Sequence, residues 1–454
     1  MAPEQTRRIR AWWLFDWANQ PYNTLLLTFI FAPYFASAVA PDPVTGQKLW
    51  GWMLALTGLS IALMAPVLGA IADSAGRWRP WLVLWSVLYV LGSVALWWAV
   101  PEAERLWPIL LAFAIGMIGL EFGIIFTNAL LPGLAPREQL GRISGTGWAI
   151  GYAGGVVSLV VMLFFLAETD TGRTLIGLAP AFGLDPEARE GTRAVGPFSA
   201  LWYVVFALPL FLLIPEHRRP RPPAGAVTRG LTELVGTLRS LPRHPSLLAY
   251  LGSSMFYRDA LNGIFAFGGI YAAGVLGWSI VQIGVFGITA AVVGAVACWL
   301  GGKADSAFGP KPVIVTGILG LIAVCLVVVT TDRTMLLGLP LPEGSPLPDI
   351  VFYACGAAIG AAGGTLQAAS RTMMVRQANP ARMTEAFGLY ALSGKVTAFM
   401  APGLVALATQ ITDSQRLGVA PLIGLFLIGL LLLLFVKPEG EPAHRWSAPA
   451  PPPP

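Results

Sequence analysis

Long apolar runs follow one another along almost the whole chain, separated by short polar stretches. Each run is about 20 residues long or longer, and an α-helix of that length crosses the hydrocarbon layer of a membrane. Only 12% of the residues are charged, whereas an ordinary soluble domain has about 25%. Most of the chain therefore does not face water, and we predict an all-α membrane protein that crosses the bilayer many times.

Charged residues, prolines and glycines bound twelve such runs. They are residues 11–39, 49–72, 80–100, 106–131, 142–167, 198–215, 246–275, 279–301, 312–330, 349–372, 384–410 and 419–436. When these spans alternate across the membrane from a cytoplasmic N-terminus, 20 of the 29 Lys and Arg residues fall on the cytoplasmic side and 7 on the outer side. This bias obeys the positive-inside rule. We therefore expect an integral protein of the cytoplasmic (inner) membrane with both termini in the cytoplasm.

The chain divides near its middle at a polar stretch rich in arginine and proline, residues 215–245, which contains one short amphipathic segment around Leu231–Leu241. This composition is typical of a cytoplasmic linker. We expect it to join an N-terminal six-helix half, residues 1–214, to a C-terminal half, residues 246–437. The Pro-rich residues 438–454 are predicted to be a disordered cytoplasmic tail.

Similar loops follow the second and the eighth span. The first reads GAIADSAGRWR at Gly69–Arg79, the second reads GGKADSAFGPK at Gly301–Lys311, and Asp73 maps onto Asp305 at the same offset as the leading glycines. The two halves are therefore predicted to be structural repeats. The glycine lets two helices approach. The aspartate can accept hydrogen bonds from a helix N-terminus and pair with the adjacent arginine, which would latch the cytoplasmic face.

This loop resembles the signature of the major facilitator superfamily, and the first copy is the better match. The residues that we expect to form a cytoplasmic gating loop are Gly69, Asp73, Gly76 and Arg77 in the first copy, and Gly301 and Asp305 in the second.

Five further segments resemble the autophagy-related vacuolar effluxer family and its bacterial relatives, the "unknown major facilitator" family. They are DWANQPY at Asp16–Tyr22, FTNALLPGLAP at Phe126–Pro136, GWAIGYAGG at Gly147–Gly155, FYRDALN at Phe256–Asn262, and the stretch Gly363–Lys395. The resemblance implies a major facilitator fold, with twelve transmembrane helices in two pseudo-symmetric six-helix halves. Its eukaryotic members are associated with amino-acid efflux from the vacuole, while most bacterial members have no assigned substrate. Proton coupling and antiport are not carried over, because span 4 has Glu121 and no arginine, and span 5 has Tyr152 in place of a proline.

Charged residues inside spans are the next signal, because a charge at the bilayer centre costs about 2.5–3.5 kcal/mol on insertion scales. Away from the ends of the spans, the chain keeps five: Asp16, Glu121, Arg258, Asp259 and Lys395. Polar side chains are predicted to lie on the same helix faces as these charges and to complete the substrate or coupling site. They are Asn19 and Asn23 in span 1, Asn128 in span 4 and Asn262 in span 7. Span 10 adds Gln367, one helical turn from Arg371. In the fold that the resemblance implies, helices 1, 4, 7 and 10 surround the central cavity.

Each of these residues also has a structural interpretation. Asp16 can be interfacial, Glu121 can be a neutral or paired packing group, and Arg258 with Asp259 can satisfy only each other. Arg371, near the cytoplasmic end of span 10, favours an interfacial anchor. The glycine runs of spans 5 and 10 are more typical of helix packing than of a ligand site.

Lys395 lies ten residues after Glu385, which is at the start of span 11. This separation predicts a depth of about 15 Å in a hydrocarbon layer of about 30 Å. From there a lysine stem does not reach either interface. We expect its ammonium to meet Glu121 first, Asp16 second, and a substrate carboxylate third, with a purely structural salt bridge as the alternative. Because desolvation favours the neutral form of a carboxyl group, Glu121 is also the expected proton carrier if transport is proton-coupled.

The function that these features favour is a secondary transporter for a small polar solute, such as an amino acid or related metabolite, working by alternating access. An exporter of amphipathic compounds is the alternative in the same class. A non-transporting receptor or an intramembrane enzyme is the alternative from another class, although the chain has no Ser/His, Cys/His or metal constellation and no nucleotide-binding loop. We expect a monomer with no cofactor, whose partners are its solute, the lipid bilayer and a coupling proton, and the thinly spread positive charge argues against nucleic acid.

Overall fold

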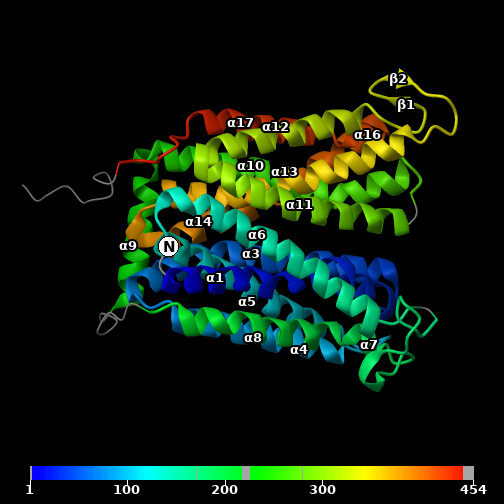
Figure 1. Ribbon diagram of the computed structural model, residues 1–454, viewed down its shortest axis with the longest axis horizontal. Coiled ribbons are helices and arrows are strands. Elements are labelled where there is room, and N and C mark those ends of the chain that lie inside the picture. The colour runs from blue at the N-terminus through cyan, green and yellow to red at the C-terminus, as the bar shows by residue number, and fades with distance from the viewer. Residues whose placement is uncertain (1–2, 170, 217–224, 279, 443–454) are drawn as a thin grey trace, which may run out of the picture. The chain divides into compact units, whose positions relative to one another are not determined.

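A computed structural model describes residues 3–169, 171–216, 225–278 and 280–442. Apart from one two-stranded hairpin, β1 (Met335–Leu336) and β2 (Leu339–Pro340), its regular structure is helical (Figure 1). Contacts divide the chain into two units. Unit 1 holds Met1–Met64, Arg77–Leu130 and Thr146–Arg221, and unit 2 holds Ala65–Gly76, Leu131–Gly145 and Pro222–Pro454.

Unit 1 is built on the first six predicted spans. Its elements are α1 (Pro3–Pro21), the π-helix η1 (Tyr22–Phe29), α2 (Phe31–Tyr34), the π-helix η2 (Phe35–Val39), most of α3 (Pro43–Ala75), α4 (Arg79–Ala95), α5 (Trp107–Leu130), most of α6 (Arg137–Val161), the short α7 (Glu190–Arg193) and α8 (Val195–Leu213). Helix α4 packs against α5 and α8, and α1 packs against α8.

Unit 2 holds the last six predicted spans. Its elements are α9 (Ala226–Ser240), α10 (Pro245–Gly274), α11 (Ile280–Phe308), α12 (Pro310–Val329), α13 (Leu347–Gln377), α14 (Met383–Val396), α15 (Met400–Thr412), α16 (Gln415–Gly418) and α17 (Pro421–Leu434). Helix α13 packs between α11 and α12, and α10 packs on α14 and α17. The last turns of α3 and the first turns of α6 also belong to this unit.

Eleven helices among the described residues are long and apolar enough to cross a membrane. They match eleven of the twelve predicted spans. The remaining predicted span, 246–275, is α10, which has 30 residues but carries Arg258, Asp259 and several other polar side chains. Part of the predicted tail, residues 443–454, lies outside the described residues.

Two predicted spans are interrupted. Helix α1 ends at Pro21, and the chain continues as a π-helix. The span predicted at 384–410 is two helices, α14 and α15, because Thr397–Phe399 is a turn. Breaks of this kind leave backbone amides and carbonyls without intrahelical partners, so neighbouring side chains must bind them.

Glycines explain how closely the helices approach. A Cβ atom on Gly119 of α5 would overlap the Tyr89 nitrogen of α4, and one on Gly360 of α13 would overlap the Ala290 oxygen of α11. On α6, a Cβ atom on Gly147 would lie 2.6 Å from an oxygen of Asp16. The packing role expected for the glycine runs of spans 5 and 10 is therefore confirmed within each unit.

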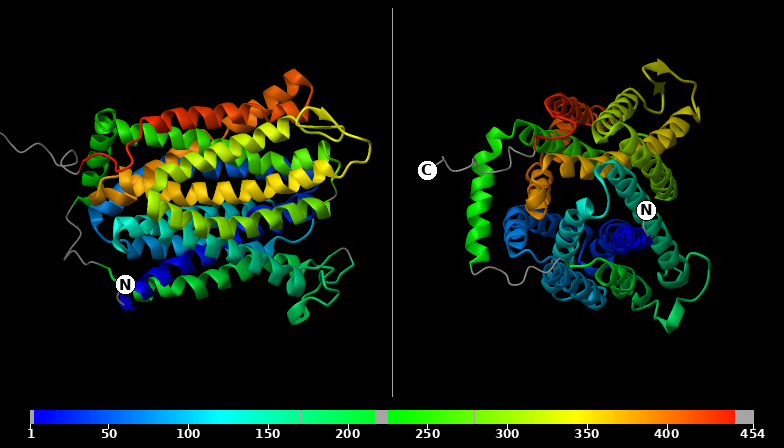
Figure 2. Two further views of the ribbon diagram at one scale, coloured as in Figure 1. Left: turned by 45° about the horizontal axis from the view of Figure 1, so that its top comes forward. Right: turned by 60° about the vertical axis from the view of Figure 1, so that its left-hand side comes forward.

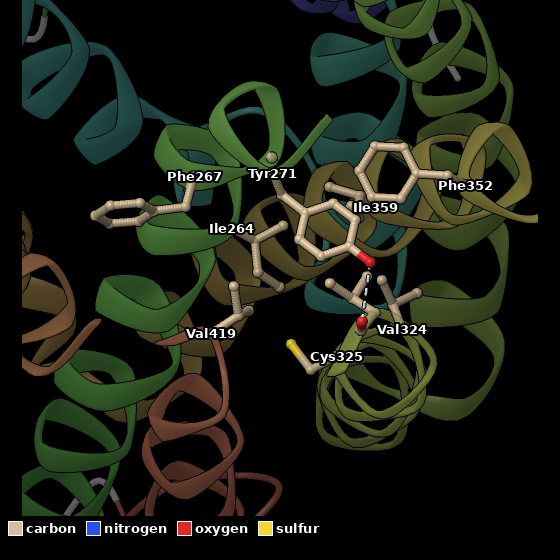
Figure 3. Close-up of a pocket in the computed structure, with 10 residues that line it drawn as sticks. Ile264, Phe267, Tyr271, Val324, Cys325, Phe352, Ile359 and Val419 are labelled. Atoms are coloured by element: carbon tan, nitrogen blue, oxygen red, sulfur yellow. Dashed lines mark hydrogen bonds between the residues drawn. The ribbon is translucent and has the colours of Figure 1, made fainter. Parts of the chain in front are cut away.

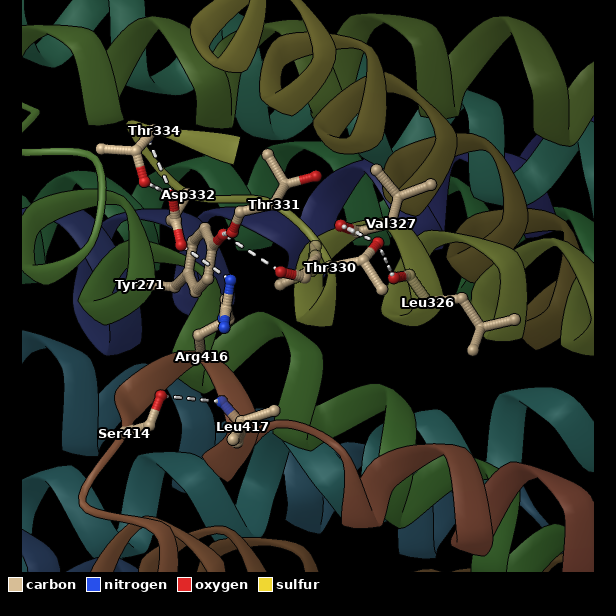
Figure 4. Close-up of polar contacts among 11 residues, drawn as sticks. Tyr271, Leu326, Val327, Thr330, Thr331, Asp332, Thr334, Ser414, Arg416 and Leu417 are labelled. Carbon is tan, nitrogen blue, oxygen red and sulfur yellow. Dashed lines mark hydrogen bonds and ion pairs between the residues drawn. The ribbon is translucent and has the colours of Figure 1, made fainter. Parts of the chain in front are cut away.

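A polar cluster fastens the ends of α10, α12 and α16 (Figure 4). The Tyr271 hydroxyl donates to the backbone oxygen of Thr331, and Arg416 pairs with Asp332 at 2.7 Å. Partial burial raises the pKa of Asp332, but hydrogen bonds from Thr334 and the charge of Arg416 outweigh it, so the pKa lies below its ordinary value. The cluster holds the three helix ends in one arrangement.

Candidate functional site

Asp73, in the last turn of α3, caps the N-terminus of α14. One carboxylate oxygen accepts a hydrogen bond from the Glu385 backbone nitrogen at 2.8 Å, and the other accepts from the Thr384 nitrogen at 3.3 Å. Gly69 allows this approach, because a Cβ there would lie 2.6 Å from the Thr384 oxygen. The carboxylate thus meets the positive end of a helix 311 residues further along the chain. The expected helix-capping contact of Asp73 is present.

More charged groups surround this contact. Arg382 pairs with the buried Glu385 and lies 3.4 Å from Glu233 of α9. Glu233 also accepts a hydrogen bond from Ser74 at 2.8 Å. The carboxylates of Asp73, Glu233 and Glu385 therefore lie around the Arg382 guanidinium and the N-terminus of α14. We call these four residues the latch cluster.

The second repeat makes a related contact with different atoms. Asp305 is 2% exposed and accepts a hydrogen bond from Thr372 of α13. It packs on Gly141 of α6, where a Cβ would lie 2.5 Å from its carboxyl carbon. The neighbouring Ser306 accepts the hydrogen bond from the Arg142 backbone nitrogen at 2.8 Å. The end of α11 thus meets the start of α6 as the end of α3 meets the start of α14.

The glycines that close the two loops both have a positive φ. Gly76 has φ +67° and Gly309 has φ +83°, and both follow the last turn of a helix. Glycine adopts a positive φ at little cost because it has no Cβ atom. The leading glycine of the second loop, Gly301, packs against Thr365.

The expected pairing of Asp73 with the adjacent arginine is wrong. Arg77 lies 3.7 Å from Glu216, which also accepts a hydrogen bond from the Arg79 backbone nitrogen. The sequence could not decide this, because Glu216 lies far along the chain from Arg77 and its approach depends on how α4 and α8 pack.

Arg258 and Asp259, neighbours on α10, bind opposite sides of the break between α14 and α15. Arg258 donates to the Tyr390 oxygen at 2.8 Å, and its guanidinium carbon lies 4.1 Å from the centre of the Tyr390 ring. Gly394 leaves space for it, because a Cβ there would lie 2.6 Å from the guanidinium. The alternative in which Arg258 and Asp259 satisfy only each other is therefore wrong.

Asp259 caps the second half of the broken span. It is 1% exposed, and its carboxylate accepts a hydrogen bond from the Ala401 nitrogen in the first turn of α15 at 2.8 Å. The helices α15 and α17, which pack beside it, carry no charged residue. The Ala401 amide and the Asp259 carboxylate therefore satisfy each other's hydrogen bonding in this buried place.

We expect Asp259→Ala to lower the free energy of unfolding by about 1–3 kcal/mol, because a buried amide loses a charged acceptor. Thermal unfolding in detergent measures this as a lower Tm. Asp259→Asn keeps an acceptor oxygen and should lose less. Asn262→Ala, at an exposed position on the same helix, is the matched control and should leave the Tm unchanged. An Asp259→Ala protein as stable as the parent would contradict the capping role.

The remaining predicted residues of unit 2 do not form one cluster. Lys395 is half-buried in the last turn of α14, directly before the break, and Gln367 is half-buried on α13. Asn262 is exposed on α10. Arg371 is 5% exposed, so its side chain lies inside the protein, and the interfacial anchor stays a prediction.

Tyrosines near Arg258 were missed by the sequence analysis. Tyr250 and Tyr257 are fully buried on α10 and direct their hydroxyls to the backbone oxygen and the hydroxyl of Ser370, at 2.6 and 2.8 Å. Tyr250 also stacks on Tyr390, with ring centres 6.1 Å apart. The motif FYRDALN contains Tyr257, but only the helix packing reveals that it contacts α13.

In unit 1, the polar stripe predicted on span 1 does not stay together. Asp16 is half-buried against Gly147 of α6, whereas Asn19 is 4% exposed. Asn23 lies beyond Pro21 in the π-helix, where the α-helical spacing used for the stripe no longer holds. The stripe was extrapolated across this change of helix type, so a shared face for Asn23 stays a prediction.

Glu121 and Asn128 are both half-buried on α5. Aromatic residues join α1 to this helix: Trp12 donates to the Thr127 oxygen at 2.8 Å, and Phe15 lies over Gly123. Since Glu121 belongs to unit 1 and Lys395 to unit 2, their pairing stays a prediction.

An apolar recess in unit 2 is a separate feature (Figure 3). Its lining is aliphatic and aromatic, and Tyr271 forms one wall with its hydroxyl turned away toward α12. The lining residues are Ile264, Phe267, Gly268, Tyr271, Val324, Cys325, Val328, Phe352, Ile359 and Val419. A recess of this chemistry suits an apolar group and not a charged solute.

Solved structures define the class of protein. The chain resembles the crystal structure of the human organic anion transporter MFSD10 (TETRAN) with TM-score 0.70 and 15% identity, over 95% of this chain and 100% of that one. It also resembles the proton:xylose symporter XylE, with TM-score 0.66 and 14% identity, over 95% of this chain and 94% of that one. At this identity the likeness shows the fold, and the predicted major facilitator fold is confirmed. The fold is thus the one shared by these two membrane transporters.

Sequence relatives define the family. The profile described as "Vacuole effluxer Atg22 like" matches residues 51–441, and the chain belongs to this family. It is 24% identical to the uncharacterized MFS-type transporter YxiO of Bacillus subtilis, over 96% of both chains. It is 25% identical to autophagy-related protein 22 of Cryptococcus neoformans over 302 residues, which is 64% of this chain and 48% of that one.

Proposed function

We propose that this transporter moves a small polar solute, an amino acid or related metabolite, by alternating access. The observation that carries the proposal is the pair Arg258 and Asp259, which place opposite charges at the two sides of a broken span. Broken helices line the substrate and ion sites of many secondary transporters. Charges of both signs suit a zwitterion, whose ammonium and carboxylate groups need opposite partners.

The family supports the same solute class. The matching profile is described as a vacuole effluxer, and the eukaryotic proteins that the sequence resembles are associated with amino-acid efflux. We further propose that both termini are cytoplasmic, that the protein lies in the inner membrane as a monomer, and that protons are the coupling ion.

A ligand-stabilisation screen tests the solute class. Purified protein is heated with single amino acids, dipeptides, nucleosides or amphipathic organic anions, and a bound ligand at 100 times its Kd adds about 2.7 kcal/mol to the apparent stability. We expect an amino acid to raise the Tm, and labelled amino acid to enter proteoliposomes that hold the same unlabelled solute. Stabilisation by dipeptides or nucleosides alone would contradict the proposal.

The second candidate is export of amphipathic compounds, which the apolar recess of Figure 3 favours. In the same screen, this function predicts stabilisation by the amphipathic anions and none by amino acids. Phe352→Ala, in the recess, should then weaken that stabilisation, whereas it should leave amino-acid binding unchanged.

We propose Glu121 as the proton carrier. Glu121→Gln keeps the size and polarity of the side chain but removes the titrating group, so gradient-driven accumulation should be lost while solute exchange continues. Accumulation and exchange are measured in the same proteoliposomes over a range of pH. Glu138→Gln, at an exposed acid in the first turn of α6, is the control. Unchanged pH dependence in Glu121→Gln would contradict the role.

A further inference from the structure

Helix α9 crosses the ends of the other helices of unit 2 instead of running alongside them (Figures 1 and 2). One face of α9 docks on the end of α3. A Cβ on Gly230 would lie 2.8 Å from the Ile71 backbone, Glu233 accepts the hydrogen bond from Ser74, and Leu234 is 6% exposed. The helix is thereby held at the level where the predicted spans leave the membrane.

A second face of α9 is apolar and exposed. Val227, Leu231, Val235 and Leu238 are 55%, 41%, 45% and 46% exposed. At about 100° per residue these four side chains fall within an arc of about 80°, next to the docking face. We call them the α9 stripe. Four aliphatic side chains in a continuous row are not expected to face water on a surface helix.

The charges of this segment are distributed unequally. Arg229 and Arg239 on α9, and Arg243 just after it, are exposed. The single acidic residue of α9, Glu233, is turned inward to Ser74 and Arg382. The outward surface therefore carries aliphatic groups flanked by positive charge, which is the pattern of helices that lie in a membrane interface.

We propose that α9 is an interfacial helix, with the α9 stripe inserted into the bordering lipid leaflet and Arg229, Arg239 and Arg243 bound to anionic headgroups. The arginine stems can reach the headgroups while the aliphatic row is covered by acyl chains. Juxtamembrane basic residues gain about 1 kcal/mol each near an anionic surface. The lipid contact then lies on the same helix as Glu233, which is a member of the latch cluster. This proposal does not depend on the identity of the solute.

Spin labels on the full-length protein test the insertion. Single cysteines are introduced at Leu231 or Val235 on the stripe, and at Thr232 or Gly236 on the polar face. The three native cysteines are buried, and the unsubstituted protein gives the background signal. In nanodiscs with one quarter anionic lipid, we expect labels at 231 and 235 to be relaxed by oxygen, and labels at 232 and 236 by a water-soluble nickel complex. Equal access of the nickel complex to all four positions would overturn the proposal.

The lipid composition and the oligomeric state separate the remaining explanations. In nanodiscs of purely zwitterionic lipid, the labels at 231 and 235 should become at least twofold more accessible to nickel, and Arg239→Gln should cause a similar change in anionic nanodiscs only. Equal accessibility in both lipid mixtures would overturn the headgroup contact. If the stripe covers a second copy instead, labels at 231 and 235 would show spin–spin broadening in a dimeric species, which would overturn the insertion. Val227 and Leu238 provide further label positions if either first variant does not fold.

Discussion

Replacing Asp73 with asparagine should slow solute transport at least tenfold while equilibrium affinity for the solute stays within a few-fold of the parent. The asparagine amide would still offer an acceptor oxygen, but not the negative charge that meets the N-terminus of α14. Hydrogen bonds to charged groups contribute about 1.5–3 kcal/mol. If one of the two transport conformations loses this stabilisation, the ratio of their populations changes by a factor of about ten or more. Transport depends on this ratio, whereas solute affinity depends on the proposed solute site at Arg258 and Asp259, to which Asp73 does not belong.

Exchange rates in proteoliposomes and ligand-induced stabilisation of the purified protein measure the two quantities separately. Asp413→Asn, at an exposed aspartate after α15, is the matched control and should change neither. Asp305→Asn should act in the same direction as Asp73→Asn, because both aspartates hold helix ends in unit 2. Complete loss of solute binding by a folded Asp73→Asn protein would rule out a role confined to switching.

Lys395→Met should abolish binding of a solute that carries a carboxylate. The ammonium lies in the last turn of α14, just before the break. There the helix C-terminus attracts a cation by about 0.3–1 kcal/mol. We propose that the carboxylate of the solute binds this ammonium during transport.

A structural salt bridge with Glu121 is the competing explanation, and a double mutant separates the two. If the bridge is structural, Lys395→Met/Glu121→Gln should regain most of the binding that Lys395→Met loses, because neither charge is left unpaired. If the contact with solute is direct, the double mutant should stay inactive. Lys48→Met, at an exposed lysine of α3, controls for the loss of a positive charge. A Lys395→Met protein that binds and transports like the parent would contradict both explanations.

The sequence by itself determined the helical membrane class, the spans and the repeat. Run length and apolarity decide whether a segment crosses a membrane, because the bilayer requires a fixed helix length and internally bonded backbone. Gly69 and Asp73 were recognised through their copies Gly301 and Asp305. Such features are local in the chain, so no knowledge of packing is needed to find them.

Only the tertiary structure decided the partners of the charged residues. Whether Arg258 meets Asp259 or Tyr390 depends on how α10 packs on α14, and the same holds for Arg77, which pairs with Glu216. The turn at Thr397–Phe399 that breaks the span contains no proline or glycine. Asp259, on another helix, stabilises this break by capping α15. A capped helix end is a contact between distant segments. Helical periodicity describes one segment at a time, so it predicts the face on which a charge lies but not the group that binds it.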